Sequence, residues 1–376
     1  MMRVLRIMLS VIGLIVVVGV VAIGSLMFFM DPNKMKPALA KEVMTRTGYQ
    51  LAIEGDLKWA FYPRFGIQLK RMTLSTPNQA MPFADLQNVS VAMGLWQFLQ
   101  GNHAWQGEVY IAKARLVNLK AQDAHVGLHW NKNLLTLQPI TANLYDGSLE
   151  GFAHGSQLSA TPHWDWVVQF NHIQLKPLLQ AVSGEANQLN VSGVAQVKFN
   201  ASTEGSEREQ LLNNLNGTSS FSVVNGSVEG VDLDYLIQSA NALMGKQPAP
   251  AQTRRHVTAF DRLSGAWLIK DGMARSYNLT LSTPILVTKG GADVNLLNEA
   301  LDSKLQIFPQ KGATLSWMVP VQVTGSLMRP EVQLDMSLLN KMISRQDIEK
   351  IKEKVRAKIK EQIPGKSGEL LQQFLG

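Results

Sequence analysis

The amino-terminal stretch constrains this chain more than any other feature. Residues 7–30 carry no charged side chain and consist mainly of Val, Ile, Leu, Met and Phe. As an α-helix, this stretch would extend roughly 36 Å, which exceeds the hydrocarbon thickness of about 30 Å in a typical bilayer. We therefore expect residues 1–30 to form a membrane anchor. Representative positions along this anchor are Ile7, Leu14, Val18, Ile23, Phe28 and Met30.

A cleaved signal peptide is the alternative interpretation of the same stretch. Arg3 and Arg6 would supply its basic region, and Ala22–Gly24 its small-residue cleavage site. The apolar run is longer than the ~7–15 residues of a signal peptide and continues to Met30, which favours the anchor.

The orientation of the anchor is not decided by the charges around it. Two arginines precede the span, and four Lys or Arg follow it up to residue 46, so a simple charge count would place the following side in the cytoplasm. Long domains are translocated largely regardless of their charge, however. We expect a cytoplasmic amino terminus, with the bulk of this single-pass protein on the other side.

Positive charge is concentrated at the two ends of the chain. The net charge is +7. Residues 1–48 hold six Lys or Arg against two acidic residues, and residues 337–376 hold nine against five, so the body between them is nearly neutral. This distribution favours contact with an anionic membrane over a nucleic-acid partner. The chain has no cysteine, which excludes disulfides and thiolate metal sites.

Most of the body reads as β-strand. Residues 164–171, 188–199, 273–282 and 316–324 each alternate apolar with mainly polar side chains, the pattern of strands with one wet face. We expect about 18 to 22 strands of this kind. The pairs Asp146–Gly147, Asn225–Gly226 and Asp271–Gly272 predict tight hairpin turns. The first two pairs lie in a seven-residue repeat, 145–151 and 224–230, which suggests a strand–turn–strand unit used twice.

A few helices are expected among these strands. Asp31 and Pro32 are suited to start a helix over 34–46 that ends before Gly48, and shorter helices are expected over 176–182, 207–215 and 231–244. The tail contains an amphipathic helix with an apolar stripe and a lysine-rich surface, ended by Pro364–Gly365. It would lie on an anionic membrane, dock on the body or bind a partner.

No catalytic or metal-binding motif is found. The chain contains no G-x-S-x-G, G-x-G-x-x-G or H-E-x-x-H pattern. His125 and His129 share a face of one strand, where residues four apart are separated by about 13 Å, too far to bind one metal ion. We therefore expect no enzyme activity, no cofactor and no metal.

The apolar faces of the strands remain as the candidate site. They would either pack against a second sheet or, in an open curved sheet, line a groove for acyl chains. Periodicity alone leaves both possibilities open. The groove candidates are Trp164, Trp166, Val168, Phe170, Leu189, Val191, Val197, Phe199, Trp267, Ile269, Leu279, Leu281, Val319 and Val321.

Several segments resemble the AsmA family in order and spacing. In the first half they are Asp31–Asn33, Thr47–Pro63 and Gly66–Leu69. In the second half they are Leu215–Leu233, Phe260–Gly265, Ile269–Gly272, Ser282–Ile285, Val319–Gly325 and Arg329–Pro330. The family also ends in a helix rich in Lys and Glu. The resemblance covers nearly the whole chain.

The resemblance implies a fold and a function. The fold is mostly β, an elongated, curved antiparallel sheet with a hydrophobic groove, few short helices, an amino-terminal transmembrane helix and a carboxy-terminal amphipathic helix. The expected divisions are the anchor (1–30), two AsmA-like β domains (31–205 and 206–336) and the basic tail (337–376).

The implied protein is anchored in the inner membrane of a Gram-negative bacterium, with its bulk in the periplasm. Related to TamB and bridge-like lipid-transfer proteins, it would bind or convey membrane phospholipid in support of outer-membrane biogenesis and integrity. This chain is short for the family, since about 20 strands would span roughly 100 Å. The alternative is a non-enzymatic assembly or structural factor for outer-membrane proteins, with a closed β core and an envelope protein partner.

Overall fold

We analysed a computed structural model of the chain. The described residues are 31–60, 65–77, 79, 81–93, 104–183, 190–244, 257–310, 317–327 and 329–342. The predicted anchor, with Ile7, Leu14, Val18, Ile23, Phe28 and Met30, lies outside these residues, as do the tail helix and the groove candidate Leu189.

One antiparallel sheet dominates the described part of the chain. It has 17 strands. Their bounds are β1 (Gln50–Glu54), β2 (Lys58–Ala60), β3 (Gly66–Ser75), β4 (Ala84–Met93), β5 (Ala104–Leu116), β6 (Leu119–Asn131), β7 (Leu134–Leu144), β8 (Gly147–Ser156), β9 (His163–Gln174), β10 (Asn190–Glu204), β11 (Asn216–Glu229), β12 (Val257–Lys270), β13 (Met273–Ser282), β14 (Leu286–Asn295), β15 (Ala300–Pro309), β16 (Val319–Ser326) and β17 (Arg329–Leu334).

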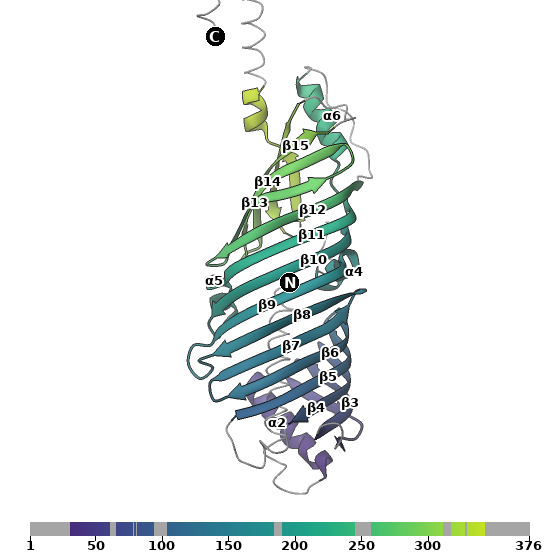
Figure 1. The fold of residues 1–376 in the computed structure, drawn as a ribbon, viewed down its shortest axis with the longest axis vertical. Helices are drawn as coiled ribbons and strands as arrows, with labels where there is room; N and C mark the ends of the chain where they lie inside the picture. The colour runs from purple at the N-terminus through teal and green to yellow at the C-terminus, as the bar shows by residue number, and fades with distance from the viewer. Residues whose placement is uncertain are drawn as a thin grey trace, which may run out of the picture.

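The strands follow one another in chain order. From β3 to β17, each strand pairs with the next. β1 and β2 both pair with β3, along its second and first halves respectively. Figure 1 shows the strands stacked along the long axis of the molecule, with α2 near one end and α6 near the other. The mostly β, single-sheet architecture is thus confirmed, and β10 and β11 continue the sheet across the predicted boundary at residue 205.

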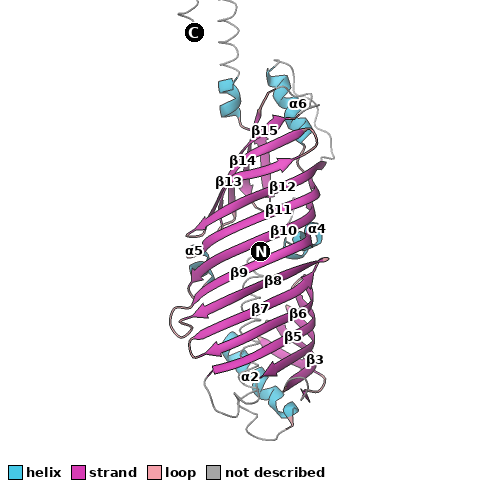
Figure 2. Ribbon diagram, in the orientation of Figure 1, coloured by secondary structure: helices cyan, strands magenta, loops and turns pink. Residues whose placement is uncertain are grey.

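Short helices occupy the ends and rims of the sheet (Figure 2). A 3₁₀ turn, η1 (Pro32–Met35), leads into α2 (Lys36–Thr47). Asp31 caps this start by accepting a hydrogen bond from the Asn33 backbone N–H at 3.0 Å, and Gly48 ends α2 with a left-handed φ of 71°. Both signals were predicted from the sequence.

The other predicted helices are present with slightly different bounds. They are α4 (Leu175–Ser183), α5 (Arg208–Asn213) and α6 (Leu233–Met244). Each follows the end of a strand and turns the chain back onto the sheet. Among the described residues, no helix has the length and hydropathy needed to cross a membrane.

The three predicted hairpin turns have different outcomes. Asp271–Gly272 forms the turn between β12 and β13, with φ of 49° and 73° as expected. The turn before β8 is shifted by one residue, because Leu144 pairs with Gly147 and leaves Tyr145 and Asp146 at its centre. Asn225–Gly226 is no turn. Asn225 lies inside β11 with a φ of 51°, so the seven-residue repeat does not mark one repeated structural unit.

Extra residues interrupt the strict alternation of several strands. In β13, the register with β12 shifts between Ser264 and Leu268, and the register with β14 shifts between Ser276 and Leu279. The predicted apolar face of β13 is therefore wrong in part, because this bulge separates Met273, Arg275 and Tyr277 from Leu279 and Leu281. Bulges bend the strand that carries them and increase its twist, which curves the sheet.

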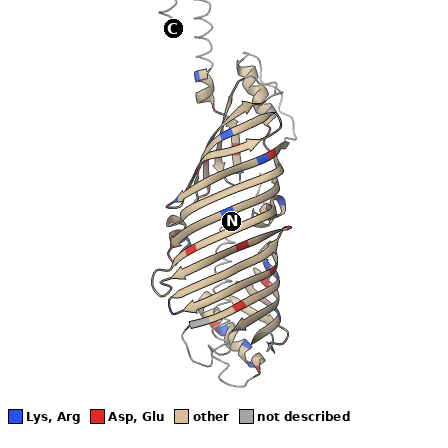
Figure 3. Ribbon diagram, in the orientation of Figure 1, with Lys and Arg blue, Asp and Glu red and all other residues tan. Residues whose placement is uncertain are grey.

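Charged side chains are sparse along the sheet (Figure 3), but one network links its first strands. Arg71 on β3 donates to Asp85 on β4 at 3.0 and 2.9 Å and to Glu54 on β1 at 3.0 Å. Arg115 on β5 lies 3.4 Å from the same Asp85 carboxylate. The hydrogen bond from Arg71 lowers the pKa of Asp85 against the opposing effect of burial.

Replacing this buried carboxylate tests its contribution to stability. The pKa of Asp85 is lower in the folded than in the unfolded protein. The ionised carboxylate therefore stabilises the folded protein above the unfolded-state pKa of about 3.9, and this stabilisation is lost as the pH falls through the folded-state pKa. We expect Asp85→Asn to lower the Tm of the full-length protein by roughly 2 °C at pH 7.

Asp293→Asn is the matched control. The Asp293 carboxylate forms an exposed pair with Arg275, and exposed pairs contribute little. In thermal unfolding between pH 7 and pH 3, the difference in Tm between Asp85→Asn and the unmodified protein should become smaller at acidic pH. A difference of the same size at every pH would contradict the assignment.

Candidate functional site: an apolar trough on the inner face

Strand register decides which side chains share a face. Directly paired residues point to the same side of a sheet, and β9 and β10 pair Phe170 with Val197, Val168 with Phe199 and Trp166 with Ala201. The rings of Trp166 and Phe199 have centroids 6.2 Å apart. We call this side the inner face, because α2, α4 and α6 pack their apolar side chains on it.

The middle of the inner face is only half-buried. From β8 to β13, the inner face presents a continuous run of large apolar side chains that remain partly exposed. They are Leu149, Trp164, Trp166, Val168, Phe170, Val197, Phe199, Phe221, Leu263, Trp267, Leu279 and Leu281. We call this run the trough. Large apolar side chains left partly exposed over adjoining strands mark binding surfaces more often than ordinary solvent-facing surface.

Two glycines in the trough lie directly against aromatic rings of the neighbouring strand. A Cβ at Gly155 would lie 2.7 Å from the ring of Trp164, and a Cβ at Gly265 would lie 3.0 Å from the ring of Phe221 and 2.6 Å from Leu279. Because each glycine has no side chain, the neighbouring ring lies over its backbone. Each ring therefore packs directly against the backbone of the neighbouring strand.

Beyond β8, the inner face continues over β6 and β7, where Val126 and Ile140 are half-buried, and is then closed by α2. Met35, Leu39 and Val43 pack with apolar residues of β1, β3, β4 and β5, and Val43 has no exposed surface. The Nζ of Lys36 donates to the Gly55 carbonyl at 2.7 Å, which ties the helix to the loop after β1.

The second end is closed by α6. Leu236, Ile237 and Ala240 pack on inner-face residues of β14 to β16, and Ala240 is fully buried. The indole N–H of Trp317 donates to the side-chain oxygen of Asn241 at 2.9 Å. Along one side, Leu175 and Leu179 of α4 pack over strand ends of β10 to β12. Along the other side, Leu215, which follows α5, packs on Ala201 and Ile269.

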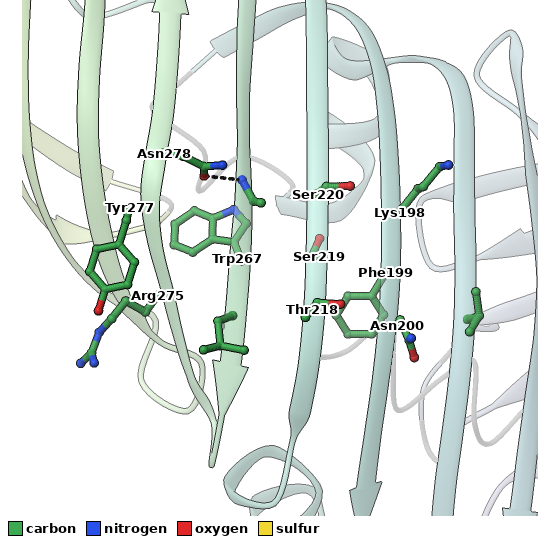
Figure 4. A pocket seen from close by; sticks show the side chains of 13 residues that line it. Lys198, Phe199, Asn200, Thr218, Ser219, Ser220, Trp267, Arg275, Tyr277 and Asn278 are labelled. Carbon is green, nitrogen blue, oxygen red and sulfur yellow. Dashed lines mark hydrogen bonds between the residues drawn. The ribbon is translucent and has the colours of Figure 1, made fainter.

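The opposite, outer face carries a shallow depression of about 680 Å³. Figure 4 shows Lys198, Ser220, Arg275, Tyr277 and Asn278 around it. It lies beside the bulge of β13, where the Asn278 side chain accepts a hydrogen bond from the Ala266 backbone N–H at 2.8 Å. The depression is open and its surface is mostly apolar, and Phe199 and Trp267, which the trough also includes, are among the residues that line it.

The predicted groove residues divide into two groups. Seven lie in the half-buried trough itself, and Leu279 and Leu281 join them once the bulge of β13 is taken into account. Val191, Ile269, Val319 and Val321 share the inner face but are buried in protein clusters at the rims and under α6. The assignment of lipid contacts to all of these positions stays a prediction.

Sequence reasoning missed several trough residues. Leu149, Phe221 and Leu263 were not among the candidates, and neither were the glycines beneath the rings. Two positions away on the same face of their strands stand Ser219 and Gly265, which weakens the apolar pattern around Phe221 and Leu263. Cross-strand pairing with Val197 and Val223 identifies them in the structure.

The ionisable side chains of the described residues do not form a metal-binding site. Among the described residues, no group of three or more His, Asp or Glu could hold a metal ion. The ring of His125 stacks on Tyr110, with centroids 4.1 Å apart, and its Nε2 lies 3.8 Å from a Glu108 carboxylate oxygen. These contacts give His125 a packing role between β5 and β6.

Sequence comparison relates the chain to known proteins. A sequence model of the AsmA family matches residues 1–102 and 93–279. The chain belongs to the AsmA family. Protein AsmA of Escherichia coli (strain K12) is 26% identical over 118 residues, which are 31% of this chain and 19% of that protein. The match thus spans about a fifth of that relative's length, and no solved structure matches the chain.

This AsmA family membership confirms the resemblance drawn from the sequence segments. It supports an envelope-related function for the chain. The open sheet with its trough is the structural feature on which a more specific function can be argued.

The contact between Gly155 and Trp164 can be tested by a double-mutant cycle. Gly155→Ala should destabilise the protein by roughly 1–3 kcal/mol, because the added methyl displaces the ring. Trp164→Leu removes the ring from that space, so Gly155→Ala should destabilise the Trp164→Leu variant much less than it destabilises the unmodified protein. Denaturant unfolding of the four proteins measures the coupling, and additive effects would show that the ring does not lie over the glycine.

Proposed function

We propose that this AsmA family chain is a single-pass inner-membrane protein whose periplasmic trough binds phospholipid by its acyl chains. The trough would convey phospholipid between membranes and so support outer-membrane biogenesis and integrity. We propose no catalytic step, no cofactor and no nucleic-acid partner.

The observation that carries this proposal is the half-buried apolar run from β8 to β13. In a purely structural sheet, Trp166, Phe199 and Trp267 would be sealed by a covering layer, because large apolar side chains stabilise a protein most when fully buried. Here they remain partly exposed on the inner face, while the ends of the same face are tightly packed. Hydrocarbon chains are the ligands that such a surface binds without polar contacts.

The size of the trough also suits acyl chains. Six strands at about 4.8 Å spacing give the trough a length of roughly 24 Å. One leaflet of a bilayer has a hydrocarbon depth of about 15 Å, half the thickness of the core. An extended acyl chain therefore fits along the trough.

Site-specific photo-crosslinking tests the lipid ligand directly. A photoreactive amino acid at Val168, Phe170, Val197 or Phe199 should form phospholipid adducts in intact cells. The same amino acid at the outer-face neighbours Val167, Gln169, Lys198 or Asn200 is the matched control and should not. Adducts with protein alone at the inner positions would favour the alternative, an assembly factor that acts through an envelope partner.

A charge placed in the trough should reduce lipid binding. Phe199→Glu puts a carboxylate on the inner face, where desolvating it beside an acyl chain costs free energy, and we expect at least about a tenfold loss of co-purifying phospholipid. Asn200→Glu places the same charge on the outer face and should have no effect. Quantitative lipid extraction from the purified variants measures both, and equal lipid contents would contradict the proposal.

A further inference from the structure

We infer that phospholipid enters and leaves the trough sideways, through the long open side between its rims, and not by sliding out through either end. This inference rests on the proposed function and adds the route by which the site is loaded. It also limits the ligand to the few lipids whose chains fit in the trough at one time.

The first end offers no passage in the described structure. Leu39 and Val43 of α2 are 2% and 0% exposed, and they pack on the inner-face residues Val89, Val91 and Val109, which are equally buried. A chain leaving at this end would have to displace the whole helix. Hydrogen bonds from Lys36 to Gly55 and between Asn33 and Leu57 hold the helix start in place.

The second end is closed in the same way. Ala240 of α6, Ile307 of β15 and Val319 of β16 each have no exposed surface. The sheet itself contributes to the closure, since Ser276, Ala292 and Ser303 lie side by side on the inner face of β13 to β15 and are also buried. The exposed apolar run therefore stops at β13.

The rims leave one side uncovered among the described residues. The apolar side chains of α4 cover strand ends at one rim, and Leu215 covers strand ends at the other. The sheet forms the floor. Between the rims, Phe170, Val197, Phe199 and Phe221 remain half-buried over consecutive strands. A lipid can thus lay its chains into the trough from the side without any displacement of α2 or α6.

The absence of native cysteines makes the route testable in the full-length protein. Asn241→Cys with Trp317→Cys, joined by a flexible bis-maleimide, ties α6 to the sheet. Lys36→Cys with Asp56→Cys, joined in the same way, ties α2 to the loop after β1. Phe199→Cys carrying a bulky maleimide fills the trough, and Asn200→Cys with the same label is its outer-face control.

Exchange of bound phospholipid with vesicles of deuterated phosphatidylethanolamine and phosphatidylglycerol is followed by native mass spectrometry. We expect both tethered proteins to exchange lipid within twofold of their untethered forms. Labelled Phe199→Cys should lose at least tenfold in lipid occupancy, and labelled Asn200→Cys should keep it.

Two failures are distinguishable. If a tether stops exchange while lipid stays bound, passage through that end is required and lateral entry is wrong, although the proposed function stands. Bound lipid that does not exchange even in the untethered protein would also overturn lateral entry. If no lipid is bound to the unmodified protein, or if the Phe199→Cys label leaves occupancy unchanged, the proposed function fails and the inference fails with it.

Discussion

The backbone hydrogen-bond ladder that runs from β3 to β17 in chain order determines the rest of this structure. Since each strand pairs with its sequence neighbour, the sheet grows in one direction and never returns to cover itself. Every strand adds a row of side chains to each face, and the apolar face has to be buried by something else. In the part of the chain that the structure describes, only short helices bury this face, and they lie at its ends and rims. Among these residues, the apolar centre of the inner face is left uncovered.

Local deviations from regular pairing give the sheet its shape. Bulges in β7, β10–β11 and β13 place two successive residues on the outer face and bend the strands around the inner one. Glycines opposite aromatic residues let Trp164 and Phe221 lie along the floor. The combination found here curves the sheet and packs these rings against the backbone of the neighbouring strands.

Much of this architecture could be predicted from the sequence. The cap of α2 by Asp31 and Gly48 was correct because both depend on the local chemistry of one or two residues. The inner face of β9 was predicted correctly because its alternation is uninterrupted from Trp164 to Phe170.

Bulges were not predictable in this way. Asn225 and Gly226 have the composition of a hairpin turn, yet their chain neighbours Val224 and Ser227 pair with β10 and β12, which keeps the segment inside a strand. The same limit applies to Tyr277 and Asn278, where one extra residue exchanges the faces of β13. The closure of the ends also escaped prediction, since it depends on where α2 and α6 pack and not on their own sequences.

Fluorescence quenching by brominated phospholipid tests most directly whether hydrocarbon occupies the trough. Bromine on an acyl chain quenches an indole that it touches, and Trp164, Trp166 and Trp267 line the trough. Loading the full-length protein with brominated lipid should quench part of its tryptophan emission, and replacing these three residues by phenylalanine should abolish that part. Quenching that persists undiminished in the triple variant would show that lipid contacts the protein elsewhere and that the trough is not its binding site.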